Sequence, residues 1–320
     1  MLKKFFSLCL ILTCASFFLA ACGHDQADGN SKKIAIMTYT KNDTFSKKLI
    51  ASMKESAQAN GMEVDIYNAN DSSDTQIAQV KKVAKMNYAA ILIRPVEANN
   101  SQEITAIAGK TPVIFYNLQP EKSVLKPNQD IYVGPNEKLA GKLQANYVLK
   151  QTSDKDTINV AILRGPSGLA AEKRTSAFQD TLRKAGKNVN YVFLDNGKWD
   201  FKTAQHLTEL FLKTNQPCDA LVANNDDMAL GAIAAFKQAK RKLPIVCGVD
   251  LSAAGKKSIQ NNQLAFSAYQ PTDSQGKTII KAALLLANKK KVTDLKGASD
   301  DDLYVYTSFE GVTAENVANY

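Results

Sequence analysis

The sequence has few of the residues that build catalytic centres. Among its 320 residues are two histidines, one tryptophan and five cysteines. His24 lies in a polar segment near the N-terminus and His206 inside an expected helix, so no Ser-His-Asp or Cys-His arrangement has an evident base. Asp226 and Asp227 are adjacent, and neighbours on a helix point about 100° apart, which does not suit paired acid and base catalysis. We expect no enzymatic activity.

Motifs for cofactors and disulfides are also missing. Gly165-Pro166-Ser167-Gly168 lacks the lysine and the spacing of a phosphate-binding loop, so we expect no nucleotide cofactor. Cys218 and Cys247 lie at opposite ends of their expected strands, which favours free thiols over a bridge between them. Disulfides therefore do not hold this fold together.

The N-terminus has the pattern of an export signal. Lys3 and Lys4 precede an apolar run over residues 5–18 that ends in Leu-Ala-Ala-Cys at Cys22. The run is shorter than the roughly 20 apolar residues of a membrane-spanning helix. The final four residues resemble the bacterial lipobox, whose cysteine is acylated. We expect residues 1–21 to be a signal peptide, residues 22–31 a lipidated tether with Cys22 as the anchor, and the protein to be extracytoplasmic and anchored to the cell membrane.

The formal charge is +9, but the lysines are scattered along expected helix faces. Scattered charge is typical of solvated surfaces, and an exported chain does not meet nucleic acid. We expect no nucleic-acid partner.

Short apolar runs alternate with segments of helical period along the whole chain, which is the pattern of parallel sheets built from right-handed βαβ units. The length that remains after export exceeds what one core usually organises, so we expect two doubly wound α/β lobes. Expected strands cover residues 34–38, 64–67, 89–93, 112–116, 131–134, 158–163, 190–194, 220–223, 245–249 and 264–268. Expected helices cover residues 45–60, 75–86, 101–108, a segment ending at 149, and residues 172–185, 201–214, 226–238 and 253–261.

In doubly wound sheets, ligands bind outside the carboxyl ends of the strands. Polar and aromatic residues follow the expected strands at these ends. They include Phe45, Arg94, Asn117, Arg174, Trp199, Asn225, Asp250 and Gln270.

Five segments together resemble the periplasmic galactose/glucose-binding proteins, and the similarity runs from about Lys33 to the C-terminus. They are Ile-Ala-Ile-Met-Thr-Tyr at 34–39, Tyr-Val-Gly at 132–134, Leu-Asp-Asn-Gly-Lys-Trp-Asp at 194–200, Ala-Asn-Asn-Asp-Asp-Met-Ala-Leu-Gly-Ala at 223–232 and Gly-Val-Asp at 248–250. The resemblance implies a type I periplasmic binding protein fold, whose lobes are joined by three crossings near Pro135, Pro271 and Tyr306. The N-terminal lobe would comprise residues 32–134 plus 272–306, and the C-terminal lobe residues 135–271 plus 307–320.

The resemblance also implies a set of sugar contacts, with Gln270 standing where the family usually has asparagine. They are Asp43, Phe45, Asn117, Arg174, Trp199, Asn225, Asp250 and Gln270. Phe45 and Trp199 could sandwich the apolar faces of a sugar ring, although both could instead be core aromatics. The polar side chains could pair with its hydroxyls. We expect Asn225 to lie in the site and Asp226 to cap the following helix.

Two departures from the family limit the ligand and the metal content. Gly168-Leu169-Ala170-Ala171 stands where the family carries a histidine and an aspartate, so two hydroxyl partners are missing. We hypothesise a ligand that is smaller or less polar at that end, such as a pentose, a deoxysugar or an alkylated glycoside. Ser153 to Thr157 is too short for the calcium loop of some members, so we expect no metal.

The sequence thus predicts a monomeric solute-binding lipoprotein that captures a monosaccharide and delivers it to the permease of an ABC transporter. The alternative is a sugar-sensing lipoprotein that signals to a membrane histidine kinase or chemoreceptor. In both roles the ligand would stabilise closure of the lobes for a partner to recognise.

Overall fold

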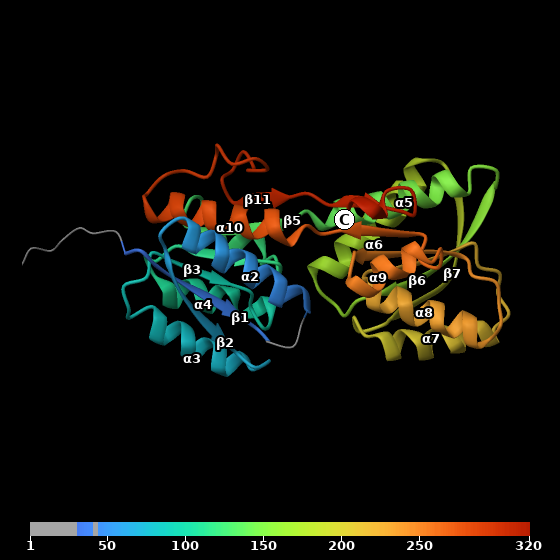
Figure 1. The fold of residues 1–320 in the computed structure, drawn as a ribbon, viewed down its shortest axis with the longest axis horizontal. Coiled ribbons are helices and arrows are strands. Elements are labelled where there is room, and N and C mark those ends of the chain that lie inside the picture. Colours follow the sequence, from blue (N-terminus) through green and yellow to red (C-terminus); the bar gives the residue numbers. More distant parts are fainter. Residues whose placement is uncertain (1–30, 41–43) are drawn as a thin grey trace, which may run out of the picture. The chain divides into compact units, whose positions relative to one another are not determined.

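The computed structural model describes residues 31–40 and 44–320. The expected signal peptide, Cys22 and Asp43 lie outside the described residues. Within these ranges the chain forms two six-stranded sheets flanked by helices (Figure 1). None of the helices in the described ranges combines the length and apolar character that a membrane span needs.

The first sheet is parallel throughout, in the order β11-β5-β4-β3-β1-β2. Its strands are β1 (Lys33–Thr38), β2 (Glu63–Asn68), β3 (Ala90–Ile93), β4 (Val113–Tyr116), β5 (Asp130–Pro135) and β11 (Tyr304–Thr307). Its helices are α2 (Thr44–Ala59), α3 (Ser73–Val83), α4 (Ser101–Ala108) and α10 (Thr272–Ala287). Because successive side chains alternate across a strand, Ile34 and Ile36 pack beneath α2 and α10, while Ala35 and Met37 pack beneath α3 and α4.

The second sheet repeats this plan in the order β12-β10-β9-β8-β6-β7, and only β12 runs antiparallel to its neighbour. Its strands are β6 (Thr157–Arg164), β7 (Asn188–Asn196), β8 (Ala220–Ala223), β9 (Ile245–Asp250), β10 (Phe266–Tyr269) and β12 (Glu310–Val312). Its helices are α5 (Glu137–Gln151), α6 (Leu169–Lys184), α7 (Phe201–Lys213), α8 (Asp226–Gln238) and α9 (Ala253–Gln260). One core lies under α5 and α6 and the other under α7, α8 and α9.

The chain passes from one sheet to the other three times. It does so between β5 and α5, between β10 and α10, and between β11 and β12. This topology confirms the expected α/β class of two doubly wound parallel sheets joined by three crossings. The third passage lies at residues 308–309, because Tyr306 still belongs to β11.

Helix α6 differs from its prediction by starting at Leu169 rather than at Glu172. Gly168 occupies the N-cap position, and the leucine and alanines that follow it are good helix formers. Residues 169–171, which precede the predicted helix, therefore form its first turn.

Polar caps hold the chain where strands give way to helices. Asn136 accepts a hydrogen bond from the backbone of Lys138, Asp200 from Thr203 and Ser252 from Gly255. Because the cap residues follow strand ends, they bring their neighbours Glu137, Trp199 and Leu251 to the carboxyl edge of the sheets.

Candidate ligand-binding site

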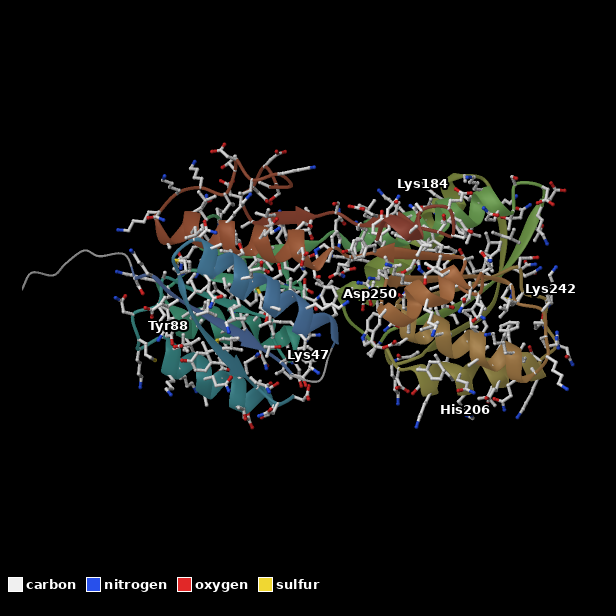
Figure 2. All side chains as sticks on the ribbon, viewed as in Figure 1. Lys47, Tyr88, Lys184, His206, Lys242 and Asp250 are labelled. Carbon is white, nitrogen blue, oxygen red and sulfur yellow. The ribbon has the colours of Figure 1, made fainter. Side chains whose placement is uncertain are left out.

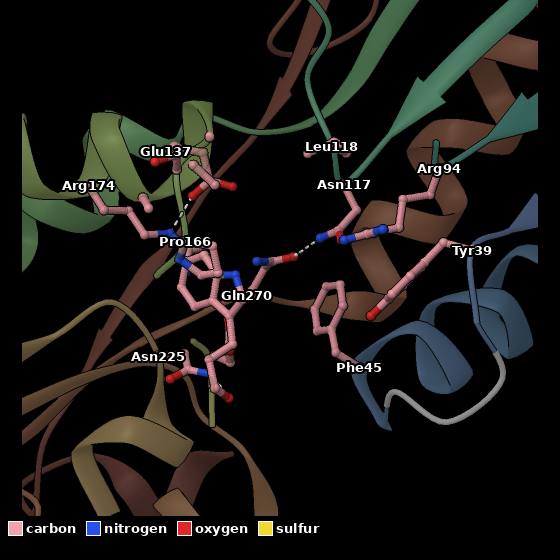
Figure 3. A pocket seen from close by; sticks show the side chains of 16 residues that line it. Tyr39, Phe45, Arg94, Asn117, Leu118, Glu137, Pro166, Arg174, Asn225 and Gln270 are labelled. Atoms are coloured by element: carbon pink, nitrogen blue, oxygen red, sulfur yellow. Dashed lines mark hydrogen bonds and ion pairs between the residues drawn. The ribbon is translucent and has the colours of Figure 1, made fainter. Parts of the chain in front are cut away.

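A cavity of about 250 Å³ is lined by residues that follow strands of both sheets (Figure 3). Seven of the eight predicted sugar contacts line it, and the eighth, Asp43, lies outside the described residues. Its size lies just below the roughly 300 to 1,000 Å³ of pockets for drug-sized ligands, so it suits a small molecule. The lining residues are Tyr39, Phe45, Arg94, Asn117, Leu118, Glu137, Pro166, Ser167, Gly168, Ala170, Ala171, Arg174, Trp199, Asn225, Asp250 and Gln270.

On the first sheet's side, Tyr39, Phe45, Arg94 and Asn117 lie together (Figure 3). The Arg94 guanidinium stacks on the Tyr39 ring at 3.4 Å from its centroid, and its Nε donates to Asn117 Oδ1 at 3.3 Å. Asn117 has a positive φ of 59° directly after β4, a conformation that asparagine tolerates better than most residues. Its Nδ2 is 3.5 Å from Oε1 of Gln270, which is itself buried. These contacts fix the orientation of the Asn117 amide at the cavity.

On the second sheet's side, Trp199 lies directly before the cap of α7 and has a φ of 59°. A Cβ added to Gly165 would overlap the indole ring, so the ring packs flat on the backbone of the Gly165 loop. Trp199 is half-buried and packs at the edge of the core under α7 and α8. The indole therefore has one side supported by protein and contributes to the cavity wall.

Arg174 is the most enclosed cation of the cavity. It is 5% exposed, and its Nε donates to Glu137 Oε2 and its Nη1 to the Asn224 carbonyl, each at 2.6 Å. The guanidinium carbon also lies 5.8 Å from the Trp199 ring and 5.7 Å from the Phe309 ring. Burial opposes its charge, but the carboxylates of Glu137 and Asp250 outweigh burial and raise the pKa of Arg174 above its ordinary value. Arg174 is therefore a fixed cation.

Asn225 lines the cavity as expected, and it also has the capping role that was expected of Asp226. Asn225, not Asp226, is the N-cap of α8: its Oδ1 accepts from the backbone of Met228 at 3.0 Å, and its Nδ2 donates to the Trp199 carbonyl at 3.3 Å. The expectation that Asp226 caps this helix is wrong, because Asp226 is already the first helical residue and its side chain turns into the protein. Asn225 both caps α8 and lines the cavity.

Asp226 supports the segment that carries Asp250. Its carboxylate accepts from the Ser252 backbone and from Ser267 Oγ, each at 2.7 Å, and Ser267 Oγ accepts in turn from the Leu251 backbone at 3.0 Å. Asp250 and Leu251 have positive φ angles of 102° and 50°, which cost of order 1 to 3 kcal/mol each in non-glycine residues. The Asp226 network holds this unfavourable backbone and so places Asp250 at the cavity.

Replacing Asp226 with asparagine should change how stability depends on pH. Burial raises the pKa of Asp226 to about 7, and the hydrogen bonds from Ser267 and Ser252 only partly offset it. A carboxyl whose pKa is raised by folding stabilises the fold most at low pH, and that stability is lost as pH rises through about 7. The wild type should therefore lose on the order of 4 kcal/mol relative to Asp226→Asn between pH 4 and pH 8. Urea unfolding at several pH values measures this difference, and parallel curves for the two proteins would contradict it.

Sequence reasoning missed several cavity residues. Tyr39 follows β1 directly and Leu118 lies two residues after β4, so both stand at strand ends, where ligands bind in such sheets. Arg94 also follows a strand but is not among the contacts that the family resemblance implies. Glu137 lies two residues after β5 and is not among the expected contacts either. His206, the histidine in the described part of the chain, is exposed on α7 and lies apart from Asp250 (Figure 2). No cluster of three or more possible metal ligands occurs in residues 31–40 and 44–320.

Comparisons with known proteins agree with this architecture. The D-galactose/methyl-galactoside binding periplasmic protein MglB of Haemophilus influenzae is 26% identical over 325 residues, covering 97% of this chain and 98% of that protein. A putative rhizopine-binding protein of Rhizobium meliloti is 26% identical over 325 residues, covering 100% and 99%. The crystal structure of an ABC transporter solute binding protein from Bacillus halodurans with bound myo-inositol has a TM-score of 0.79 and 27% identity, covering 92% of this chain and 98% of that one.

Most of the chain also matches a known protein domain family. Residues 34–291 match the periplasmic binding protein domain, and this range includes both sheets except β11 and β12. The chain belongs to the periplasmic binding protein domain family.

Proposed function

We propose that this protein is an extracytoplasmic solute-binding lipoprotein that captures a monosaccharide and delivers it to the membrane permease of an ABC transporter. The cavity carries the proposal, since the aromatic residues Phe45, in α2, and Trp199, between β7 and α7, line it beside the polar side chains of Asn117, Arg174 and Asp250. A sugar has apolar faces and a polar edge, which match aromatic walls and a rim of amide, guanidinium and carboxylate groups. Members of the family are substrate-binding proteins rather than enzymes.

We propose that residues 32–134 with 272–306 form one lobe and residues 135–271 with 307–320 the other, and that the protein works as a monomer. A lipid on Cys22 holds it at the membrane after removal of residues 1–21. The ligand is a galactose- or glucose-like hexose or a pentose, and Ala170 and Ala171, which line the cavity on the first turn of α6, offer it no side-chain hydrogen bonds. The names of the relatives, which include galactose- and inositol-binding proteins, support a hydroxyl-rich ring.

Titration calorimetry with D-galactose, D-glucose, D-xylose, L-arabinose, D-ribose and myo-inositol tests the proposal. Hydrogen bonds to charged groups contribute about 1.5 to 3 kcal/mol each, so a few of them reach the roughly 8 kcal/mol of micromolar binding. We expect at least one of these compounds to bind in the micromolar range or tighter. Absence of binding to all six would contradict the proposal, and tight glucose binding without pentose binding would refute the smaller ligand.

A further inference from the structure

Glu137 is a buried carboxylate at the cavity that neither the sequence nor the family resemblance assigns to the ligand. It is the first residue of α5, it is 3% exposed and it lines the cavity. Within the described part of the chain, its side-chain hydrogen bonding uses Oε2 alone, toward Arg174. Oε1 is not one of the fully enclosed side-chain atoms of the described residues that lack a partner, so it is accessible at the cavity and can accept a hydrogen bond from a donor there.

The packing of α5 on α6 places this carboxylate beside the two alanines of the cavity wall. In the chain, α5 comes directly before β6 and α6 directly after it, so the two helices run in the same direction. A Cβ added to Gly141 would overlap the Arg174 backbone carbonyl, which shows that the helices touch at this level. One turn earlier on each helix lie Glu137 and Ala170. Glu137 therefore reaches the region where the sequence lacks hydroxyl partners.

We propose that Glu137 is a specificity-determining residue that accepts a hydrogen bond, through Oε1, from one ligand hydroxyl beside Ala170 and Ala171. This proposal rests on the proposed function, because it names a contact of the same sugar. The acceptor missing from the start of α6 is supplied by the neighbouring helix. That end of the cavity then accommodates one hydroxyl at Glu137, beside the apolar side chains of Ala170 and Ala171. Arg174 remains paired through Oε2 and keeps Glu137 in place.

The test combines a protein variant with ligands that lack single hydroxyls. Calorimetry compares the wild type and Glu137→Gln with D-galactose, D-glucose and D-xylose and with the monodeoxy derivatives of each. Glutamine keeps a carbonyl oxygen for Arg174 and removes the charged acceptor. We expect Glu137→Gln to weaken binding of the parent sugar about 10- to 100-fold, and to have no further effect on the one derivative that lacks the contacted hydroxyl. Glu172→Gln is the control, since Glu172 is exposed on the first turn of α6.

An equal loss of affinity for the parent sugar and every derivative would overturn the proposal, because it would mean that Glu137 acts only by holding Arg174. Unchanged affinity of Glu137→Gln would overturn it as well. A wild type that binds none of the sugars overturns the proposed function too, and this separates the two failures. Thermal unfolding of the unliganded variant verifies that it is folded.

Discussion

Replacing Trp199 with alanine should weaken sugar binding at least 100-fold, a loss of about 3 kcal/mol. The indole is supported on one side by the Gly165 backbone and lines the cavity, so its removal takes away an apolar wall for the sugar ring. Unliganded stability should fall by less than about 2 kcal/mol, because Trp199 is only half-buried at the edge of its core. Calorimetry and urea unfolding of the variant measure the two effects.

Tyr191→Ala is the matched control for this change, because Tyr191 is an aromatic residue on β7 that is 41% exposed and does not line the cavity. It should leave sugar affinity unchanged. A stability loss of about 3 to 5 kcal/mol for Trp199→Ala with intact binding would place Trp199 in the core instead of the site.

Replacing Arg174 with methionine should both abolish binding and destabilise the protein by about 3 to 5 kcal/mol. The change leaves the carboxylate of Glu137 buried without its charged partner, since the two side chains are 6% and 4% exposed. Removing both charges in Arg174→Met with Glu137→Leu should recover much of the stability, because a buried ion pair can often be replaced by apolar residues. It should not recover binding. Chemical unfolding and calorimetry of the single and double variants distinguish these outcomes.

Arg183→Met provides the comparison on the same helix. Arg183 pairs with Asp180 on the surface, where its side chain is 73% exposed, so its loss should cost less than about 1 kcal/mol. If Arg174→Met unfolded at the same urea concentration as Arg183→Met, the buried pair with Glu137 would not matter for stability.

The sequence predicts the central strands well because they are short, apolar and buried on both faces. Ile34 to Thr38 is such a run, and its alternate residues enter two different cores. The edge strands β2 and β7 have exposed residues, and β11 and β12 are not predicted. The start of α6 is harder to predict, since Leu169 to Ala171 carry no polar residue that marks a helix beginning. The prediction therefore begins at the first acidic residue, Glu172.

The aromatic and polar residues of the cavity can be predicted because they follow strand ends. Glu137 also follows a strand end, two residues after β5, but acidic residues are common in the first turn of helices, where they interact favourably with the helix dipole. Its position after the cap Asn136 is therefore explained without a ligand. The contact between α5 and α6, which joins residues far apart in sequence, then pairs it with Arg174.

The most direct test of a sugar site is a crystal structure of the protein grown with the tightest-binding sugar of the calorimetric panel. We predict a sugar ring held between the side chains of Phe45 and Trp199, with Asn117, Arg174 and Asp250 within hydrogen-bonding distance of its hydroxyls. Sugar bound elsewhere on the molecule, with this cavity holding only water, would contradict the account.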